Sequence, residues 1–446
     1  MTQKILILGA GRSASSLIDY LLKNAEKEDW LVTVADYSLA LVNEKINGRN
    51  NGEALKIDVN NDQERKKIIS KADIVISMLP ADFHILVAET CVDFGVNLVT
   101  ASYVSPEMKA LDEKAKEKGV LILNECGLDP GIDHMSAMKV IDKIREEGHE
   151  LTSFESFTGG LLAPSDEENP WEYKFTWNPR NVVMAGTGSV KFIQEGKYKF
   201  IPYHRLFRRT EQVHIPKYGY FEGYANRDSL KYLDVYNLRG IKTLYRGTFR
   251  RPGFCKAWDI FVQIGATDDT YLMDGVGNMT HRDFINSFLS YNPHDSIELK
   301  LAHYLGLDID GQEMYRLKWL GIFDDDQVGL KKGTPAQILE HILKKKWTLN
   351  NDDRDMIVMW HKFDFLDNGR SRQIQSTMIA VGEDAVQTGM SKTVGLPMGI
   401  ATKLILKGNI SLKGVHIPIK KEIYNPILEE LSKLGIELNE KEIEQS

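Results

Sequence analysis

Cysteine is scarce in this sequence. Only Cys91, Cys126 and Cys255 occur among 446 residues, and no two of them form a CxxC pair. An odd number of widely spaced cysteines indicates neither a disulfide framework nor a zinc site. Such usage is typical of a reducing compartment, so we expect a cytoplasmic protein.

Long apolar runs and an excess of positive charge are also missing. No stretch approaches the ~20 residues of a membrane-spanning helix, and glycines and Asp19 interrupt the N-terminal segment that could pass for a signal peptide. The formal net charge of −7 gives no broad basic surface for nucleic acid. The lysines within 343–347 are typical of a solvated helix end. We therefore expect no membrane and no nucleic acid as partners.

The spacing of metal ligands is missing as well. His134 follows Asp129 and Asp133, but no second histidine stands four residues further on. We therefore interpret His134 as a structural histidine and predict no metal site.

The remaining composition is that of a globular protein. Hydrophobic residues make up 42% and charged residues 27% of the chain, close to the averages for soluble domains. A chain of 446 residues is long enough for two or three domains.

The first 22 residues have the pattern of a strand, a glycine turn and a helix. Apolar residues 5–8 precede the turn, and leucines at helical spacing follow it. Gly9 permits a sharp turn, Gly11 lets the backbone approach a pyrophosphate, and Ala14 fills the third small position of a dinucleotide motif. A glycine turn without a ligand is the alternative. The cofactor contacts predicted in this loop are Gly9, Gly11, Arg12, Ser13 and Ala14.

The second predicted strand ends in Asp36. An acidic side chain at this position can bind the hydroxyls of the adenosine ribose, and no Arg or Lys follows at once to receive a 2′-phosphate. Asp36 therefore favours NAD as the cofactor.

Apolar strand patterns then alternate with helical ones up to residue 125. Such alternation predicts a parallel sheet covered on both faces, with ligands at the carboxyl ends of its strands. The Asp129-Pro130-Gly131 corner follows the last of these strands, so we expect it beside the nicotinamide. The strands are predicted at 53–59, 72–80, 97–102 and 120–125, and further cofactor contacts at Asp58, Val59, Ser77 and Met78.

The pattern changes after residue 150. Segments rich in β-branched and aromatic residues predict an antiparallel sheet, with a hairpin turn at Asp367-Asn368-Gly369. The predicted fold class is α/β: a Rossmann-type doubly wound parallel sheet plus a second, mixed α+β sheet domain with a helical insertion. We place the Rossmann domain at 1–129 and 393–446, the mixed-sheet domain at 130–270 and 353–392, and the helical insertion at 271–352.

Several long motifs occur in an order and spacing that are similar to those of a known family. They include "SMLPADFH", "TASYVSPEM", "NECGLDPGIDHM", "GGLLAPSDEENPWEYKF", "YRGTFRRPGF" and "KTVGLPMGIATKLIL". The chain resembles the glutamate-forming saccharopine dehydrogenases from its first glycine to its final helix. Lysine 6-dehydrogenase and carboxynorspermidine synthase match the middle segments less well and remain alternatives.

The resemblance implies hydride transfer at a carbon–nitrogen bond. Saccharopine would be interconverted with glutamate and α-aminoadipate semialdehyde, in lysine metabolism, by a homodimer that uses NADP. This sequence departs from the family at two positions. Thr158 stands where many members have cysteine, and Asp36 stands where NADP-using members tend to place a residue suited to the 2′-phosphate. NAD and NADP therefore both remain open as cofactors.

A substrate with three carboxylates needs cations in its site, because buried charges without partners are disfavoured. Arg227 and Arg250 are the candidates, since each guanidinium can bind a carboxylate through two hydrogen bonds. The resemblance implies that Leu128 and Pro130 border the nicotinamide. It also implies that the substrate contacts Ser102, Tyr103, Asp129, Thr248 and Phe249.

Acid–base candidates for imine formation and hydrolysis are Tyr103, Asp129 and Lys174. Asp129 has a second interpretation, as the N-cap of a helix that begins near Ile132. A scaffold that binds a dinucleotide without catalysis is the alternative function from another class, although such a protein would not need the Arg227 and Arg250 pair.

Overall fold

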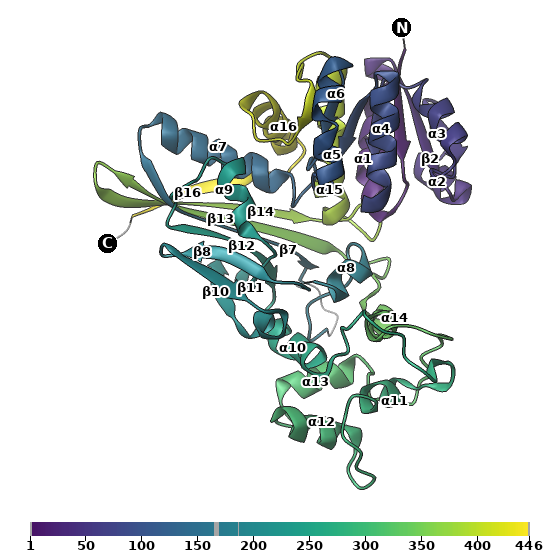
Figure 1. Ribbon diagram of the computed structural model, residues 1–446, viewed down its shortest axis with the longest axis vertical. Coiled ribbons are helices and arrows are strands. Elements are labelled where there is room, and N and C mark those ends of the chain that lie inside the picture. The colour runs from purple at the N-terminus through teal and green to yellow at the C-terminus, as the bar shows by residue number, and fades with distance from the viewer. Residues whose placement is uncertain (1, 165–168, 186, 445–446) are drawn as a thin grey trace. The chain divides into compact units, whose positions relative to one another are not determined.

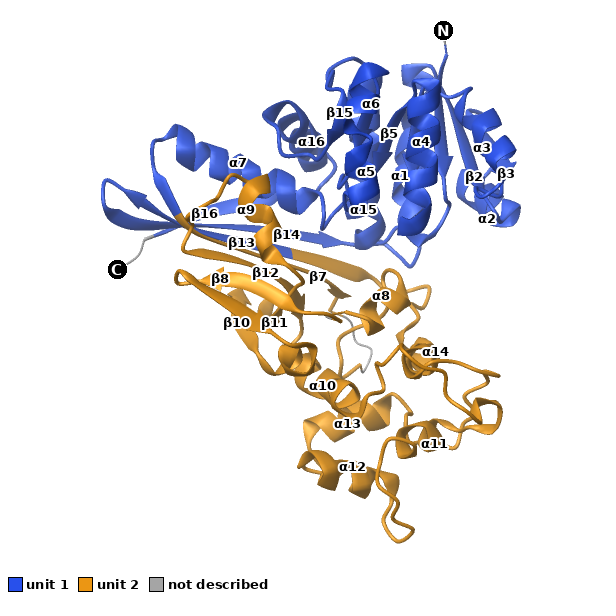
Figure 2. Cartoon of the chain, viewed as in Figure 1, with its two compact units in different colours: residues 1–151, 359–446 blue, residues 152–358 orange. Residues whose placement is uncertain are grey.

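The computed structural model describes residues 2–164, 169–185 and 187–444. The chain divides into two compact units (Figure 2): unit 1 contains residues 1–151 and 359–446, and unit 2 contains residues 152–358. The domain ranges predicted above were drawn from sequence patterns, whereas these two units are defined by contacts within the structure. The predicted ranges therefore stay a prediction.

Unit 1 contains a seven-stranded sheet in which every paired strand is parallel to its neighbour. This confirms the predicted Rossmann-type sheet, and the pairing brings the carboxyl ends of all the strands to one edge. The strand order is β15-β6-β5-β4-β1-β2-β3. The strands are β1 (Gln3–Leu8), β2 (Trp30–Asp36), β3 (Gly52–Lys56), β4 (Ile74–Ser77), β5 (Asn97–Thr100), β6 (Leu121–Leu123) and β15 (Gly414–His416).

Helices flank this sheet (Figure 1). They are α1 (Ser15–Glu28), α2 (Leu39–Ile46), α3 (Asp62–Ile69), α4 (His84–Phe94), α5 (Pro106–Ala110), α6 (Asp112–Glu117), α15 (Gly389–Leu406) and α16 (Lys421–Lys433). Unit 1 also contains α7 (Ile132–Glu146), which packs against α16. Helix α15 lies directly against α1: a Cβ atom added to Gly395 would lie 2.8 Å from the backbone nitrogen of Leu17. The Ser391 hydroxyl also accepts a hydrogen bond from the Ser16 N–H at 2.9 Å. Glycine in α15 therefore permits the close approach of two helices far apart in the sequence.

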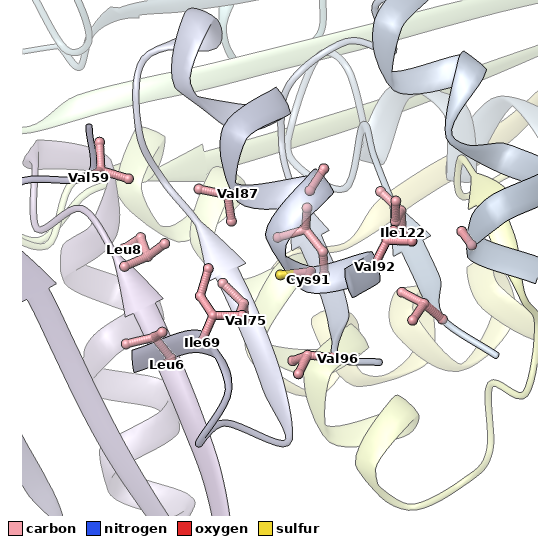
Figure 3. Close-up of a cluster of buried hydrophobic side chains, with 14 of the residues drawn as sticks. Leu6, Leu8, Val59, Ile69, Val75, Val87, Cys91, Val92, Val96 and Ile122 are labelled. Carbon is pink, nitrogen blue, oxygen red and sulfur yellow. The ribbon is translucent and has the colours of Figure 1, made fainter. Parts of the chain in front are cut away.

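Alternate residues of the strands build an apolar core on one face of the sheet (Figure 3). Leu6 and Leu8 from β1 and Val75 from β4 meet Val87 and Cys91 from α4, and none of these is more than 3% exposed. Burial of each such aliphatic side chain contributes about 1.5–3 kcal/mol, so the strands are held rigidly beneath the loops at their ends.

Unit 1 also contains most of an antiparallel hairpin. Strand β13 (Asp355–Asp367), which enters unit 1 at residue 359, leads into β14 (Arg370–Val381), which pairs with β16 (Leu438–Glu444). The turn between β13 and β14 has Asn368 at φ 48° and Gly369 at φ 82°. The hairpin turn predicted from Asp-Asn-Gly is thereby confirmed.

Unit 2 is built around a mixed sheet. Strands β10, β11 and β12 pair antiparallel, whereas β12 and β7 are parallel. This confirms the predicted mixed sheet. The strands are β7 (Glu150–Leu162), β8 (Val190–Gln194), β9 (Lys197–Ile201), β10 (Thr210–Ile215), β11 (Gly219–Ala225) and β12 (Thr243–Arg250).

The region predicted as a helical insertion is helical. Its α14 begins with Thr334 as N-cap, Pro335 in the first turn and a capping box closed by Gln337, an arrangement that favours the start of a helix. The helices of unit 2 are α8 (Pro179–Val183), α9 (Tyr232–Val235), α10 (Phe254–Ile264), α11 (His281–Asn286), α12 (Ile297–Leu305), α13 (Gln312–Trp319) and α14 (Pro335–Trp347). Across the described part of the chain, no helix has both the length and the apolar character needed to cross a membrane.

Candidate functional site

The two glycines of the loop after β1 have different roles. One is required by the backbone conformation, and the other leaves open space for a ligand. Gly9 has φ +101°, and a Cβ atom added there would lie 2.9 Å from the Met78 carbonyl oxygen, so the fold itself requires glycine. Gly11 has an ordinary φ of −65° and would meet no described atom within 4 Å of an added Cβ. The open space beside Gly11, at the start of the 3-10 turn Arg12–Ala14 and helix α1, suits the close approach of a pyrophosphate.

Asp36 joins the end of β2 to this loop. One carboxylate oxygen accepts a hydrogen bond from the Ala10 N–H at 2.8 Å, and the other accepts one from the Ser38 N–H at 2.9 Å. Each oxygen retains a second lone pair. Asp36 therefore has a structural role that the sequence did not reveal, and this role requires no ribose.

The turn after β3 lies at the same edge of the sheet. The Asp58 side chain accepts a hydrogen bond from the Asn60 N–H at 3.0 Å, and the Val59 carbonyl accepts one from the buried Arg65 guanidinium at 2.7 Å. Both predicted cofactor contacts thus occupy a fixed turn. After the end of β4, which pairs with β1, the Met78 N–H donates a hydrogen bond to the Leu8 carbonyl at 2.8 Å.

A buried histidine connects two predicted site residues. The Nδ1 atom of His84 lies 2.8 Å from the Ser77 hydroxyl, and its Nε2 atom lies 2.6 Å from the Ser102 hydroxyl. His84 is only 4% exposed, and burial lowers its pKa to about 4. Sequence reasoning did not assign His84 a role, although it stands within the motif "SMLPADFH".

The segment that carries Ser102 and Tyr103 is anchored by Glu125. The Glu125 N–H donates to the Ser102 carbonyl at 3.1 Å, and its side chain accepts from the Val104 N–H at 3.0 Å. The same carboxylate lies 2.6 Å from His134 Nε2. His134 is thus placed by a buried carboxylate, while Tyr103 is 38% exposed at the surface of the unit.

The corner at 127–131 is set by backbone crowding. Gly131 has φ +149°, and an added Cβ would lie 2.0 Å from the Gly127 carbonyl oxygen, so no other residue fits. Gly131 is the N-cap of α7, and the Asp133 side chain accepts a hydrogen bond from its N–H at 2.6 Å. Asp129 is therefore not the N-cap of this helix, and the capping interpretation of Asp129 is wrong. Leu128 and Pro130 are buried beside it.

In unit 2, Arg250 is a buried cation surrounded by rings. It is 4% exposed at the end of β12, and its guanidinium carbon lies 4.9 Å from the ring centroid of Tyr173, 5.8 Å from Tyr224 and 5.2 Å from Phe254. One guanidinium nitrogen donates to the Phe249 carbonyl at 2.8 Å. Among the residues that the structure describes, Nε has no hydrogen-bond partner and no carboxylate forms an ion pair with this group.

Strand β12 presents the other predicted substrate contacts on alternate faces. Thr248 shares a face with Arg250, whereas the Phe249 ring points into the core and stacks on Phe157 with 5.2 Å between ring centroids. Phe249 can therefore offer a ligand mainly its backbone. Thr158 pairs in register with Thr248 and buries a hydroxyl that lacks a hydrogen-bond partner within the described ranges.

Arg227 and Lys174 differ from Arg250 in their surroundings. Arg227 is exposed after the end of β11 and has φ 49°. The Lys174 ammonium is 1% exposed and lies 2.8 Å from the carboxylate of Asp353, which is 7% exposed. This buried ion pair gives Lys174 a structural partner. The catalytic assignments of Tyr103, Asp129 and Lys174 stay predictions.

Comparison with known proteins covers nearly the whole chain. Residues 5–123 match the family described as "Saccharopine dehydrogenase NADP binding domain", and residues 127–436 match "Saccharopine dehydrogenase C-terminal domain". Two proteins called "Saccharopine dehydrogenase [NADP(+), L-glutamate-forming]" are each 33% identical, one from Schizosaccharomyces pombe (99% of both chains) and one from Saccharomyces cerevisiae (99% of this chain and 100% of the relative). The mitochondrial alpha-aminoadipic semialdehyde synthase of Rattus norvegicus is 32% identical over 98% of this chain, which spans 47% of that protein.

Comparison with solved structures gives the same family. An apo saccharopine dehydrogenase (L-Glu forming) from Saccharomyces cerevisiae has a TM-score of 0.90 at 32% identity, covering 99% of this chain and 100% of that one. A homospermidine synthase from Legionella pneumophila shares the fold, with a TM-score of 0.56 at 11% identity over 100% of this chain and 92% of that one. The names of the yeast relatives and of the N-terminal family specify NADP. The preference for NAD that we predicted from Asp36 is not supported by these comparisons, and the backbone hydrogen bonds of Asp36 give this residue another reason to be present.

Proposed function

Because this chain belongs to the saccharopine dehydrogenase family, we propose that it interconverts saccharopine with glutamate and α-aminoadipate semialdehyde in lysine metabolism. The full-length match to the glutamate-forming enzymes at 33% identity carries this proposal. A dinucleotide, when bound, would supply hydride exchange at the carbon–nitrogen bond, and the residues of the chain would bind and orient the reactants.

Unit 1 contributes the dinucleotide-binding elements. The open backbone at Gly11 and the helix start after it suit a pyrophosphate. Asp58, Val59, Ser77 and Met78 lie at or just after the carboxyl ends of the parallel strands β3 and β4, where ligands of such sheets bind.

Unit 2 contributes cations for the carboxylates of saccharopine. Arg250 fits this role best, because its guanidinium is already desolvated and forms no direct ion pair with a described carboxylate; the buried Glu222, opposite it on β11, acts on the charge only at longer range. A substrate carboxylate would supply a direct, hydrogen-bonded counter-charge. We propose Arg227 as a second, more exposed contact, and Ser102, Tyr103, Asp129, Thr248 and the Phe249 backbone as neutral or proton-exchanging contacts.

The test is turnover with alternative substrates. Purified protein is mixed with NADP or NAD and with saccharopine or lysine, and the absorbance of the reduced nicotinamide is followed. Saccharopine-dependent reduction with release of glutamate is expected. Reduction with lysine alone would instead identify a lysine 6-dehydrogenase, and no reduction with saccharopine while the dinucleotide binds would indicate a scaffold.

For the cofactor, we propose that the enzyme uses NADP(H) and that the Asp36 carboxylate weakens its preference over NAD(H). A negative charge at the end of β2 disfavours a 2′-phosphate, whereas it can accept hydrogen bonds from free ribose hydroxyls. Asp36→Asn keeps an acceptor for the Ala10 N–H and removes the charge. The ratio of NADPH to NADH affinity should then rise about tenfold, or ~1.4 kcal/mol. Glu53→Gln, an exposed carboxylate on β3, is the control and should leave the ratio unchanged; an unchanged ratio in Asp36→Asn would contradict the proposal.

We also propose that the enzyme is a cytoplasmic homodimer. The three cysteines are buried and free, which suits a reducing compartment. Light scattering of the purified protein gives the subunit number, and a monomer at micromolar concentration would refute the dimer.

A further inference from the structure

His84 joins two strand ends of unit 1 that the proposed function assigns to different reactants. Ser77 is the last residue of β4 and is a predicted cofactor contact, while Ser102 follows β5 and is a predicted substrate contact. The imidazole contacts both hydroxyls, at 2.8 Å through Nδ1 and at 2.6 Å through Nε2. No other described side chain bridges these two serines.

The imidazole is neutral at physiological pH, because burial lowers the His84 pKa to about 4. A neutral imidazole has one nitrogen that donates a hydrogen bond and one that accepts. The hydrogen bonds from the ring to the two serines must therefore run in opposite directions. If one hydroxyl donates its proton to His84, the other must accept the ring N–H.

We propose that His84 is a positioning residue that couples the Ser77 hydroxyl on the cofactor side to the Ser102 hydroxyl on the substrate side. When Ser102 donates to Nε2, its oxygen can only accept from a ligand, and Ser77 accepts the Nδ1–H and keeps its own proton for a ligand. When Ser77 donates to Nδ1, the two roles are exchanged. A ligand that fixes the direction at one serine thus fixes it at the other.

Burial and backbone hydrogen bonds hold the two serines in place beside His84. Ser77 is 1% exposed, and the Ser102 carbonyl is held by the Glu125 N–H at 3.1 Å while the Ser102 N–H contacts the Thr100 hydroxyl at 3.3 Å. These backbone hydrogen bonds fix the position of Ser102, and its hydroxyl leaves His84 only by losing a partly buried hydrogen bond. The inference rests on the proposed function, which places the two reactants at these two serines.

A double-mutant cycle on dinucleotide binding tests the coupling. The dissociation constant of NADPH, or of NADH if it binds more tightly, is measured by nicotinamide fluorescence for Ser77→Ala, Ser102→Ala and the double variant. The effects are expected to be non-additive by at least threefold. The control cycle pairs Ser77→Ala with Ser432→Ala, an exposed serine of α16, and is expected to be additive.

His84 variants locate the coupling in the ring. In the His84→Phe background the first cycle is expected to become additive. His84→Asn places an amide near Nδ1 and His84→Gln places one near Nε2, so each should restore only one serine contact. An additive cycle in the wild-type background overturns the inference, and this result does not require His84→Phe to fold. Since saccharopine is absent from the assay, a protein that binds dinucleotide without oxidising saccharopine refutes the proposed function but still decides the coupling.

Discussion

Replacement of Arg250 by methionine should separate binding from stability. In the free protein this guanidinium has one hydrogen bond, to the Phe249 carbonyl, and three aromatic neighbours. Cation–π contacts contribute about 0.5–2 kcal/mol each and a charged hydrogen bond about 1.5–3 kcal/mol. Desolvation of the cation costs several kcal/mol. These opposing contributions are of similar size, so the free energy of unfolding should change by only about 1 kcal/mol.

Substrate binding should respond much more strongly. Loss of one partner from a buried, hydrogen-bonded charge pair costs about 2–5 kcal/mol, which corresponds to a rise of roughly 30- to 4,000-fold in the KM for saccharopine. Arg250→Lys keeps the charge but loses the two-pronged geometry, so its KM should be intermediate. The exposed Arg205, replaced by methionine, is the matched control.

The assay is saccharopine-dependent dinucleotide reduction, run beside thermal unfolding of each variant. The reasoning would be refuted if Arg250→Met left the KM within threefold of the wild-type value. A Tm lowered by more than about 10 °C with normal KM would likewise show that Arg250 serves the fold rather than the substrate.

Three further predictions follow from unit 1 and unit 2. Gly11→Ala should leave the Tm unchanged and weaken dinucleotide binding at least tenfold, about 1.4 kcal/mol. Gly9→Ala should instead lower the Tm, because its φ and the nearby Met78 carbonyl exclude a side chain. If both variants changed the Tm and the binding equally, the two glycines would not have these separate roles. Lys174→Met should cost about 3–5 kcal/mol by leaving the Asp353 carboxylate buried without a cation, and adding Asp353→Leu should restore the Tm. If kcat returns with the Tm in that double variant, Lys174 is not catalytic. Finally, the unfolded chain protonates His84 near its ordinary pKa of 6.5, whereas the folded pKa is about 4, so the free energy of unfolding should fall by roughly 3 kcal/mol as pH drops through this window. Chemical denaturation at several pH values should show a smaller loss in His84→Gln, and an identical pH dependence would rule out this source.

Local patterns predicted the parts of the fold that depend on neighbouring residues. The strand–glycine–helix of residues 5–22 formed as expected because Gly9 permits the positive φ of +101° that its own turn requires. The turn at Asn368 and Gly369 formed for the same reason, since both residues adopt positive φ. The start of α14 likewise depends on neighbouring residues, since Thr334 and Gln337 form its capping box.

The buried polar groups of the site could not be predicted in this way. Lys174 and Asp353 are 179 positions apart, so their ion pair depends on the finished fold. His84 gained its partners only because β4 and β5 are neighbours in the sheet. At the corner, Asp129 precedes an apolar run as a capping residue would, but the N-cap is Gly131, whose N–H donates to the Asp133 side chain.

The nucleotide-binding unit is completed by the end of the chain, and this has a consequence for its synthesis on the ribosome. Strand β15 adds to the sheet beside β6, and α15 covers α1, although both emerge after the whole of residues 152–358. Until then β6 is an unpaired edge strand and α1 lacks the helix that packs on it. Exposed edges and apolar surfaces of this kind bind chaperones or promote misassembly. A message truncated before codon 389 would therefore produce a chain unable to finish its first-made domain, even though every glycine-loop residue had been translated.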